Sequence, residues 1–206
     1  PDLPKVWEFY CFNLLVRCFE EAGFELEDSD DLEPAFVNLS RGNERIKISY
    51  EPALSSSDSS LLISSTRFRG QRLNPDYVVE VELESGRKKY FVLDAKYTDQ
   101  KMVEKLRADE IFQKYALYLH TREFVPVDGV FALFPLASNE NWLLGSGRGG
   151  PYVGQINPKL GWLGVPVGLD PLADLMPALD TIFEGLLLGE TTDRVSEAPL
   201  EESQTG

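Results

Sequence analysis

Two neighbouring segments, residues 74–83 and 90–97, alternate apolar and polar side chains and are rich in β-branched and aromatic residues. The sequence Glu-Ser-Gly-Arg at 84–87 lies between them and favours a tight turn, so the pattern predicts a β-hairpin. Because successive side chains of a strand point to opposite faces, Asp94 and Lys96 share one face of the second strand. The polar face of the first strand carries Asp76.

The register of this hairpin has two alternatives. A loop of three residues pairs Leu83 with Arg87 and therefore Asp76 with Asp94. A slip of two residues places Asp76 opposite Lys96 instead. Either register brings two carboxylates and one lysine to within about 5–8 Å of one another on the same face.

Such a cluster has a specific chemistry. Two carboxylates about 4 Å apart repel by roughly 4 kcal/mol at an effective dielectric near 20, and a divalent cation between them removes that cost. Mg²⁺ prefers oxygen ligands, so Asp76, Asp94 and the backbone carbonyl of Ala95 are candidate ligands, with Mn²⁺ expected to substitute. Lys96 would hold the attacking water or the charge on a phosphate. The residues predict a magnesium-dependent phosphodiesterase. The alternative is a strand face with Glu80, Glu82 and Lys96 that is merely solvated.

The order of these segments resembles the PD-(D/E)XK nuclease superfamily, over roughly residues 5–189. More narrowly, it is similar to the nuclease domains of McrC-like restriction proteins. The resemblance rests on Pro75-Asp76, on Leu93-Asp94-Ala95-Lys96-Tyr97, on the helical segment Glu110-Ile111-Phe112-Gln113-Lys114-Tyr115, and on Trp7-Glu8-Phe9-Tyr10.

The resemblance implies roles for two further residues. Glu8 would be an outer-sphere or second-metal carboxylate on the first helix, and Gln113 would orient the water or contact phosphate. Related nucleases often have a tyrosine four residues after this glutamine, whereas position 117 is a leucine here, with Tyr115 and Tyr118 nearby. The implied activity is that of a magnesium-dependent endodeoxyribonuclease.

The fold class that we expect is α/β, with a mixed central sheet flanked by the first helix and the Gln113 helix. One domain is expected over residues 1–189, followed by a disordered acidic tail at 190–206. Periodicity predicts helices at 6–22, 103–119 and 172–188, and strands outside the hairpin at 35–39, 45–50, 61–68, 129–136 and 162–167.

Composition excludes several other classes. His120 is the only histidine, so nucleases and metalloproteases that depend on several histidines are excluded. Cys11 and Cys18 have the spacing of a buried helical stripe. The chain has no run of 18 apolar residues and no signal peptide, so we expect a cytoplasmic protein without a membrane partner. The absence of a glycine-rich phosphate loop disfavours a sugar or small-phosphate hydrolase.

The net charge of −14 opposes binding to a polyanion. Most of it lies in residues 20–33 and 190–206, and the remainder is nearly balanced. A modest phosphate-binding rim is expected from Arg67, Arg69, Arg72, Lys101, Lys105 and Arg107.

We therefore expect DNA as the substrate and an excised domain of a larger restriction or defence protein. Its partners would be other domains of the same polypeptide or an NTPase or recognition subunit. The alternative is a catalytically silent nuclease-fold module that assembles with a nucleotide-driven motor.

Overall fold

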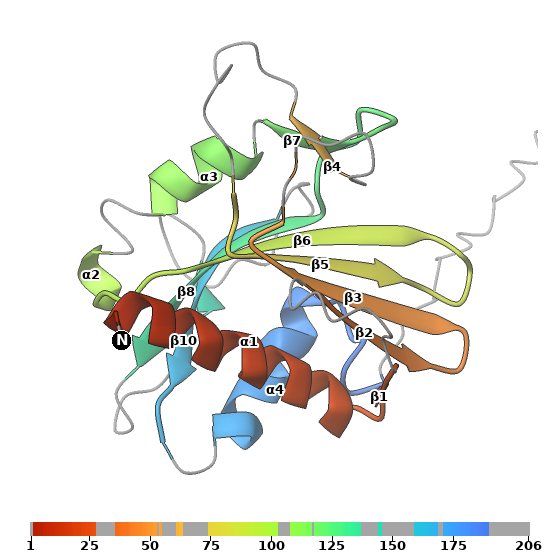
Figure 1. The fold of residues 1–206 in the computed structure, drawn as a ribbon, viewed down its shortest axis with the longest axis horizontal. Coiled ribbons are helices and arrows are strands. Elements are labelled where there is room, and N and C mark those ends of the chain that lie inside the picture. The colour runs from red at the N-terminus through yellow and green to blue at the C-terminus, as the bar shows by residue number, and fades with distance from the viewer. Residues whose placement is uncertain are drawn as a thin grey trace, which may run out of the picture.

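A mixed eight-stranded sheet forms the centre of the molecule (Figure 1). The computed structural model describes residues 2–27, 36–52, 54, 61–63, 74–102, 108–116, 118–136, 144–145, 159–168 and 171–189 of the chain. The strands lie in the order β1 (Glu25–Leu26), β2 (Phe36–Arg41), β3 (Glu44–Tyr50), β5 (Tyr77–Glu82), β6 (Lys88–Ala95), β8 (Gly129–Leu136), β10 (Lys159–Pro166) and β9 (Leu144–Gly145).

The sheet changes direction at β6. From β1 through β2, β3 and β5 to β6, neighbouring strands pair antiparallel. Strands β6, β8 and β10 pair parallel, and β9 pairs antiparallel with β10. Strand β6 therefore has an antiparallel neighbour on one side and a parallel neighbour on the other. It is almost entirely buried, as expected for a strand covered on both faces.

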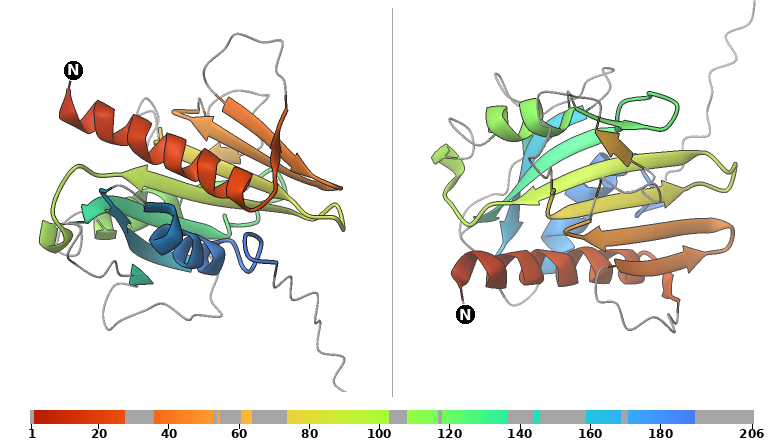
Figure 2. Two further views of the ribbon diagram at one scale, coloured as in Figure 1. Left: turned by 90° about the horizontal axis from the view of Figure 1, so that it is seen from below. Right: turned by 45° about the horizontal axis from the view of Figure 1, so that its top comes forward.

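Helices cover both faces of the sheet (Figures 1 and 2). Helices α1 (Leu3–Glu21) and α4 (Pro171–Ile182) pack with the apolar face that includes Phe91 and Leu93. Helix α3 (Ala108–Ala116) packs with the opposite face, beside Val92. The predicted α/β fold with the first helix and the Gln113 helix on a mixed sheet is confirmed.

Helix α1 forms because its buried positions recur at helical spacing. Cys11, Leu14 and Cys18 lie on one stripe against the core, and both cysteines are free and buried, as predicted. The chain leaves the helix at Gly23, whose φ of 84° is accessible to glycine at little cost.

The hairpin has the first of the two predicted registers. Strands β5 and β6 pair from Tyr77 opposite Leu93 to Glu82 opposite Lys88, and the Leu83 N–H donates to the Arg87 carbonyl at 2.9 Å. The register with a slip of two residues is wrong, because the turn fixes the pairing of the residues that flank it.

Several predicted boundaries differ from the structure. The predicted helix at 103–119 is wrong at its end, because the described helix α3 stops at Ala116 and Leu119 begins β7 (Leu119–Thr121). Strand β7 pairs with β4 (Leu61–Ile63) in a separate two-stranded sheet. A short helix, α2 (Gln100–Met102), precedes α3.

The predicted closing helix is also shorter than expected. Helix α4 ends at Ile182 and is followed by turns, in which Glu184 and Gly185 have positive φ. The predicted tail at 190–206 lies outside the described residues, so the domain boundary stays a prediction. Within the described part of the chain, no helix combines the length and the apolar character needed to cross a membrane.

Candidate active site

The two acids of the hairpin meet where β5 begins and β6 ends. Asp76 directly precedes β5, and its Oδ2 accepts a hydrogen bond from the Ala95 N–H at 2.6 Å. Asp94 lies in β6, one residue before Ala95, and is only 2% exposed. The hydrogen bond from Ala95 fixes one carboxylate beside the other, so the predicted convergence of Asp76 and Asp94 is present.

Lys96 joins the acids from the same strand. Its ammonium forms an ion pair with Oδ2 of Asp94, and its side chain is 30% exposed. Its backbone N–H donates to the Leu133 carbonyl of β8 at 2.7 Å, which holds the end of β6 against the sheet. A fixed backbone and a partly exposed ammonium place a positive charge at the solvent side of the two carboxylates.

The crowding of negative charge affects Asp76 most clearly. Its pKa is raised from 3.8 to about 7, first because the carboxyl is buried and second because Asp94 lies nearby. Lys96 and the Ala95 N–H oppose this rise, whereas Glu8 adds to it. The site therefore favours binding of a positive charge beside Asp76.

Glu8 approaches the acids from helix α1 but is held by other groups. Its Oε2 accepts hydrogen bonds from Lys5 Nζ at 2.7 Å and from the Tyr50 hydroxyl at 2.8 Å. Its backbone carbonyl accepts a hydrogen bond from the Tyr77 hydroxyl at 2.6 Å. Lys5 also bridges to Glu51 at 2.6 Å. These contacts hold Glu8 beside the site, and its Oε2 is already occupied by Lys5 and Tyr50, so Glu8 is not placed as a direct metal ligand.

Tyr115 is a site residue that the sequence did not assign. Tyr115 is a residue of α3, and its ring is fully buried. Its hydroxyl is 3.2 Å from Oδ1 of Asp94 and 3.1 Å from the Asn74 carbonyl. Burial, followed by the charges of Asp94 and Asp76, raises its pKa, so the phenol stays protonated as a donor. In the sequence, the one indication that Tyr115 is buried was its place on the apolar stripe of α3, four residues after Ile111.

Tyr115→Phe is expected to lower the affinity for Mg²⁺ or Mn²⁺ by about 10–100-fold, because a group that orients a metal-binding carboxylate is lost. Isothermal calorimetry measures this change. Tyr118→Phe, which removes a hydroxyl three residues further along, is the control. Equal metal affinity in the wild type and in Tyr115→Phe would show that this hydroxyl serves packing alone.

The donor set fits a hard divalent cation. Two carboxylates and the carbonyl of Ala95 are oxygen ligands of the kind that Mg²⁺ and Mn²⁺ prefer. Within the described ranges, no group of three or more His, Cys, Asp or Glu side chains gathers as a metal-binding cluster. Water and substrate oxygens commonly complete the coordination of Mg²⁺.

The remaining candidates have other positions. Gln113 lies within α3, but its side chain is outside the described part of the structure. Glu80 forms an ion pair with Lys88 at 2.7 Å, and its side chain is only 16% exposed, so it has its own cationic partner away from the two acids. Of the expected basic rim, Lys101 is exposed in α2. The others, Arg67, Arg69, Arg72, Lys105 and Arg107, lie outside the described residues.

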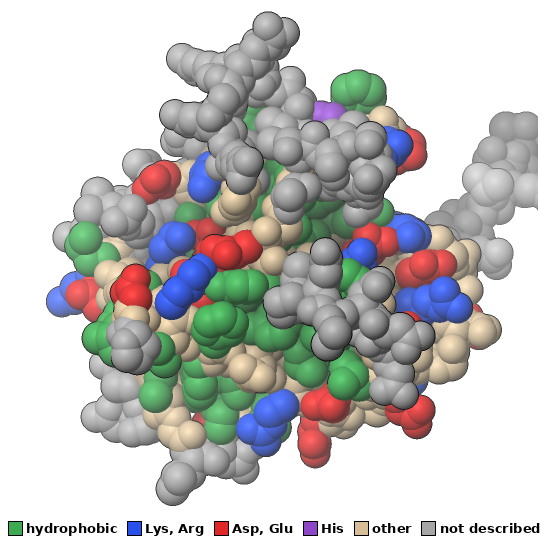
Figure 3. Space-filling model, viewed as in Figure 1, with side chains coloured by type: hydrophobic (Ala, Val, Ile, Leu, Met, Phe, Trp, Pro, Cys, Tyr) green, Lys and Arg blue, Asp and Glu red, His purple; other side chains and the backbone are tan. Residues whose placement is uncertain are grey.

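The visible surface is not uniformly acidic. On the face seen in Figure 3, acidic and basic side chains are interspersed around exposed apolar ones. The net charge of −14 is therefore not spread as a single acidic field over this side of the molecule.

Comparison with known proteins identifies the family of the chain. A family model described as the PD-(D/E)XK nuclease superfamily matches residues 5–138. The matched range includes helix α1, the hairpin with Asp76, Asp94 and Lys96, and helix α3. A comparison with curated proteins and a comparison with solved structures each found no match.

Proposed function

The chain belongs to the PD-(D/E)XK nuclease superfamily, and we propose that it is a metal-dependent endonuclease domain that hydrolyses phosphodiester bonds in DNA. The observation that carries the proposal is the arrangement of Asp76, Asp94 and Lys96 at the ends of two adjacent strands. Two adjacent carboxylates can hold a cation, and the partly exposed ammonium beside them can stabilise charge on a phosphate.

Each residue of the site has a defined task. Asp76 and Asp94, with the Ala95 carbonyl, would hold Mg²⁺ or Mn²⁺. The cation, when bound, lowers the pKa of a water and neutralises charge on the phosphate. Lys96 would leave its ion pair with Asp94 to donate hydrogen bonds to the attacking water or to a phosphate oxygen.

The remaining residues act on the geometry. Tyr115 orients Asp94, and Glu8 would bind a water of the metal shell while Lys5 and Tyr50 hold its side chain. Gln113 would orient the attacking water. In the reaction, the water gives up a proton to solvent as its oxygen forms a bond to phosphorus, the bond to the leaving ester oxygen breaks, and that oxygen takes up a proton from solvent.

The proposal extends to the larger setting of the chain. The likeness to nuclease domains of McrC-like restriction proteins stays a prediction, as does a place in a restriction or defence complex. A net charge of −14 supports dependence on other domains or on an NTPase or recognition subunit to deliver DNA. The same charge favours the second candidate, a catalytically silent module in such an assembly.

The test is a cleavage assay with Mg²⁺ or Mn²⁺ on duplex DNA, single-stranded DNA and RNA. We expect cleavage of DNA by the wild type, none with a chelator, and none by Asp94→Ala. Glu84→Ala removes an acid from the exposed turn of the same hairpin and should cleave like the wild type. Equal cleavage by Asp94→Ala and wild type would rule out this site, and no cleavage even in the full assembly would favour the silent module.

A further inference from the structure

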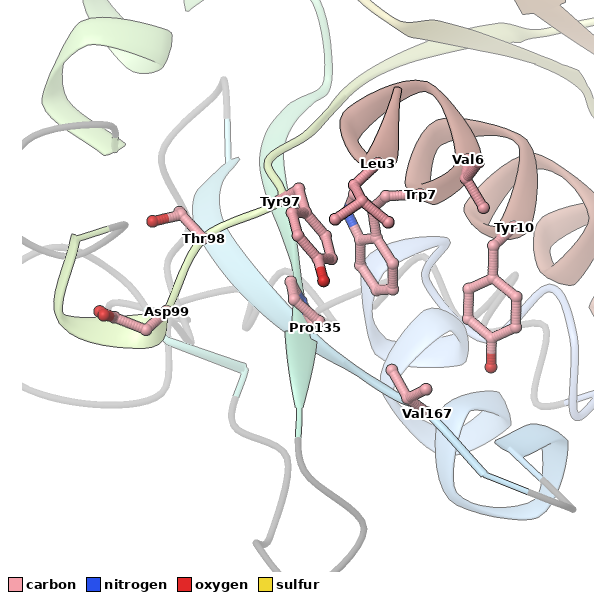
Figure 4. Close-up of a pocket in the computed structure, with 9 residues that line it drawn as sticks. All are labelled: Leu3, Val6, Trp7, Tyr10, Tyr97, Thr98, Asp99, Pro135 and Val167. Carbon is pink, nitrogen blue, oxygen red and sulfur yellow. The ribbon is translucent and has the colours of Figure 1, made fainter. Parts of the chain in front are cut away.

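A second feature lies beside the acidic site. A cavity of about 580 Å³ opens between the start of helix α1, the end of β8 and the segments that follow β6 and β10 (Figure 4). Its volume lies within the roughly 300–1,000 Å³ typical of small-molecule sites. The lining residues are mostly apolar or aromatic: Leu3, Val6, Trp7, Tyr10, Tyr97, Thr98, Asp99, Pro135 and Val167.

The cavity and the acidic site share their backbone supports. Trp7 lines the cavity and the next residue, Glu8, lies beside the acids; Lys96 pairs with Asp94 and the next residue, Tyr97, lines the cavity. Consecutive Cα atoms are about 3.8 Å apart. Side chains of successive residues leave the backbone in different directions, so a nucleic-acid strand with a phosphate at Lys96 has to pass the end of β6 to place a base in the cavity.

The aromatic side chains form a stacking surface. Trp7 stacks on Tyr10 with ring centroids 5.6 Å apart and planes inclined by 28°, and the Tyr97 ring lies 6.4 Å from Trp7. Figure 4 shows the Tyr97 and Trp7 rings next to each other at the cavity. Tyr97 is 51% exposed, so one part of its ring is available to a ligand.

The polar atoms of the cavity differ in their hydrogen bonding. The Tyr10 hydroxyl donates to the Pro166 carbonyl at 2.9 Å. Trp7 is 5% exposed, and its Nε1 has no hydrogen-bond partner within the described structure. A buried indole N–H normally finds an acceptor, so Trp7 is an exception. Its nitrogen is itself buried, and the exposed ring of Tyr97 is therefore the surface that a ligand can contact.

We propose that this cavity binds an unpaired nucleobase of the nucleic acid whose phosphate lies at Lys96, an inference that rests on the proposed function. Asp99 is the one charged side chain among the described lining residues, so the cavity suits a neutral base and not a phosphate. A base stacks on an aromatic ring through its π-face and carries acceptor atoms at its edge. The substrate class is therefore DNA that is single-stranded or frayed beside the cleaved bond.

Tyr97→Ala tests the proposal. Binding of a fluorescent oligothymidylate of 12 nucleotides is measured by anisotropy at low salt with Mg²⁺, in a Lys96→Ala background that slows cleavage. We expect Tyr97→Ala to weaken binding by about 5–150-fold, which is the loss of roughly 1–3 kcal/mol for one stacked base. Tyr97→Phe should restore the affinity. Phe124→Ala removes a 77% exposed aromatic ring outside the cavity and should leave binding unchanged.

An abasic oligonucleotide of the same length separates base binding from phosphate binding. The parent protein should bind the abasic strand more weakly than it binds oligothymidylate. The affinity for the abasic strand should be the same in the parent protein and in Tyr97→Ala. Equal affinity for both oligonucleotides, or no effect of Tyr97→Ala, overturns the inference. Binding of an apolar peptide that oligothymidylate does not displace also overturns it, and identifies the cavity as a protein-docking groove.

The same proteins distinguish failure of this inference from failure of the proposed function. Calorimetry with Mg²⁺ reports on the acidic site, whereas the difference between oligothymidylate and the abasic strand, repeated without metal, reports on the cavity. Loss of metal binding with a retained base preference contradicts the nuclease site alone. Normal metal binding without a base preference contradicts the cavity alone.

Discussion

Lys96→Ala is expected to slow metal-dependent cleavage by about 10²–10³-fold, because the ammonium stabilises charge that develops in the transition state. The ion pair with Asp94 and the 30% exposure of the side chain place this charge between the acids and solvent. Single-turnover kinetics measure the rate of the chemical step. The affinity for Mg²⁺ should stay within severalfold of the wild type or rise, because no ligand is removed and one competing cation is lost.

Two further lysine variants sharpen this result. Lys47→Ala removes the same charge from β3, where Lys47 lies over the Phe36 ring, and should leave the rate unchanged. Lys96→Arg keeps the charge but changes its shape, so partial activity is expected. A Lys96→Ala rate within threefold of wild type would contradict a catalytic role for this side chain and leave it as a partner of Asp94.

The local part of the site was predictable from the sequence. The turn before Arg87 fixes the pairing of β5 with β6, and alternation then places Asp94 and Lys96 on the face of Asp76. These rules act between residues close in sequence. The hydrogen bond from Ala95 to Asp76 follows from the same register, although no rule of alternation predicted its partner atoms.

Contacts from distant segments could not be predicted. The Tyr115 hydroxyl meets Asp94, which is 21 residues away, only because α3 packs on the face of the sheet opposite α1. The Tyr50 hydroxyl of β3 reaches Glu8, which is 42 residues away, only because α1 packs beside β3. Periodicity predicts which side of an element is buried but not which element covers it.

The helix boundary at Leu119 failed for a related reason. Leu119 is compatible with an apolar helical position, yet it forms the first pair of β7 with Ile63 of β4. Ile63 lies 56 residues before Leu119, so this pairing is a tertiary contact, and tertiary contacts override local helix propensity.

Asp76→Asn and Asp94→Asn are each expected to lower the affinity for Mg²⁺ and Mn²⁺ by at least about 100-fold, because even groups that only orient a ligand cost roughly 10–100-fold when removed. Both amides can still accept the hydrogen bonds from Ala95 or Tyr115, so local geometry is retained. Isothermal calorimetry measures the affinity. Glu84→Gln in the exposed turn is the matched control and should bind metal like the wild type.

The metal-free thermal midpoint separates lost ligands from lost structure. Asp76→Asn should raise the midpoint at pH 8, because a buried carboxylate with a pKa of about 7 is ionised there beside Asp94. Since the folded-state pKa lies above the usual 3.8, the advantage of the amide is complete above about pH 7 and disappears as the pH falls towards 4. Asp94→Asn should not gain in this way, because it leaves Lys96 without its partner. Unchanged metal affinity in both variants, at midpoints that confirm folding, would show that the acidic pair does not bind the metal.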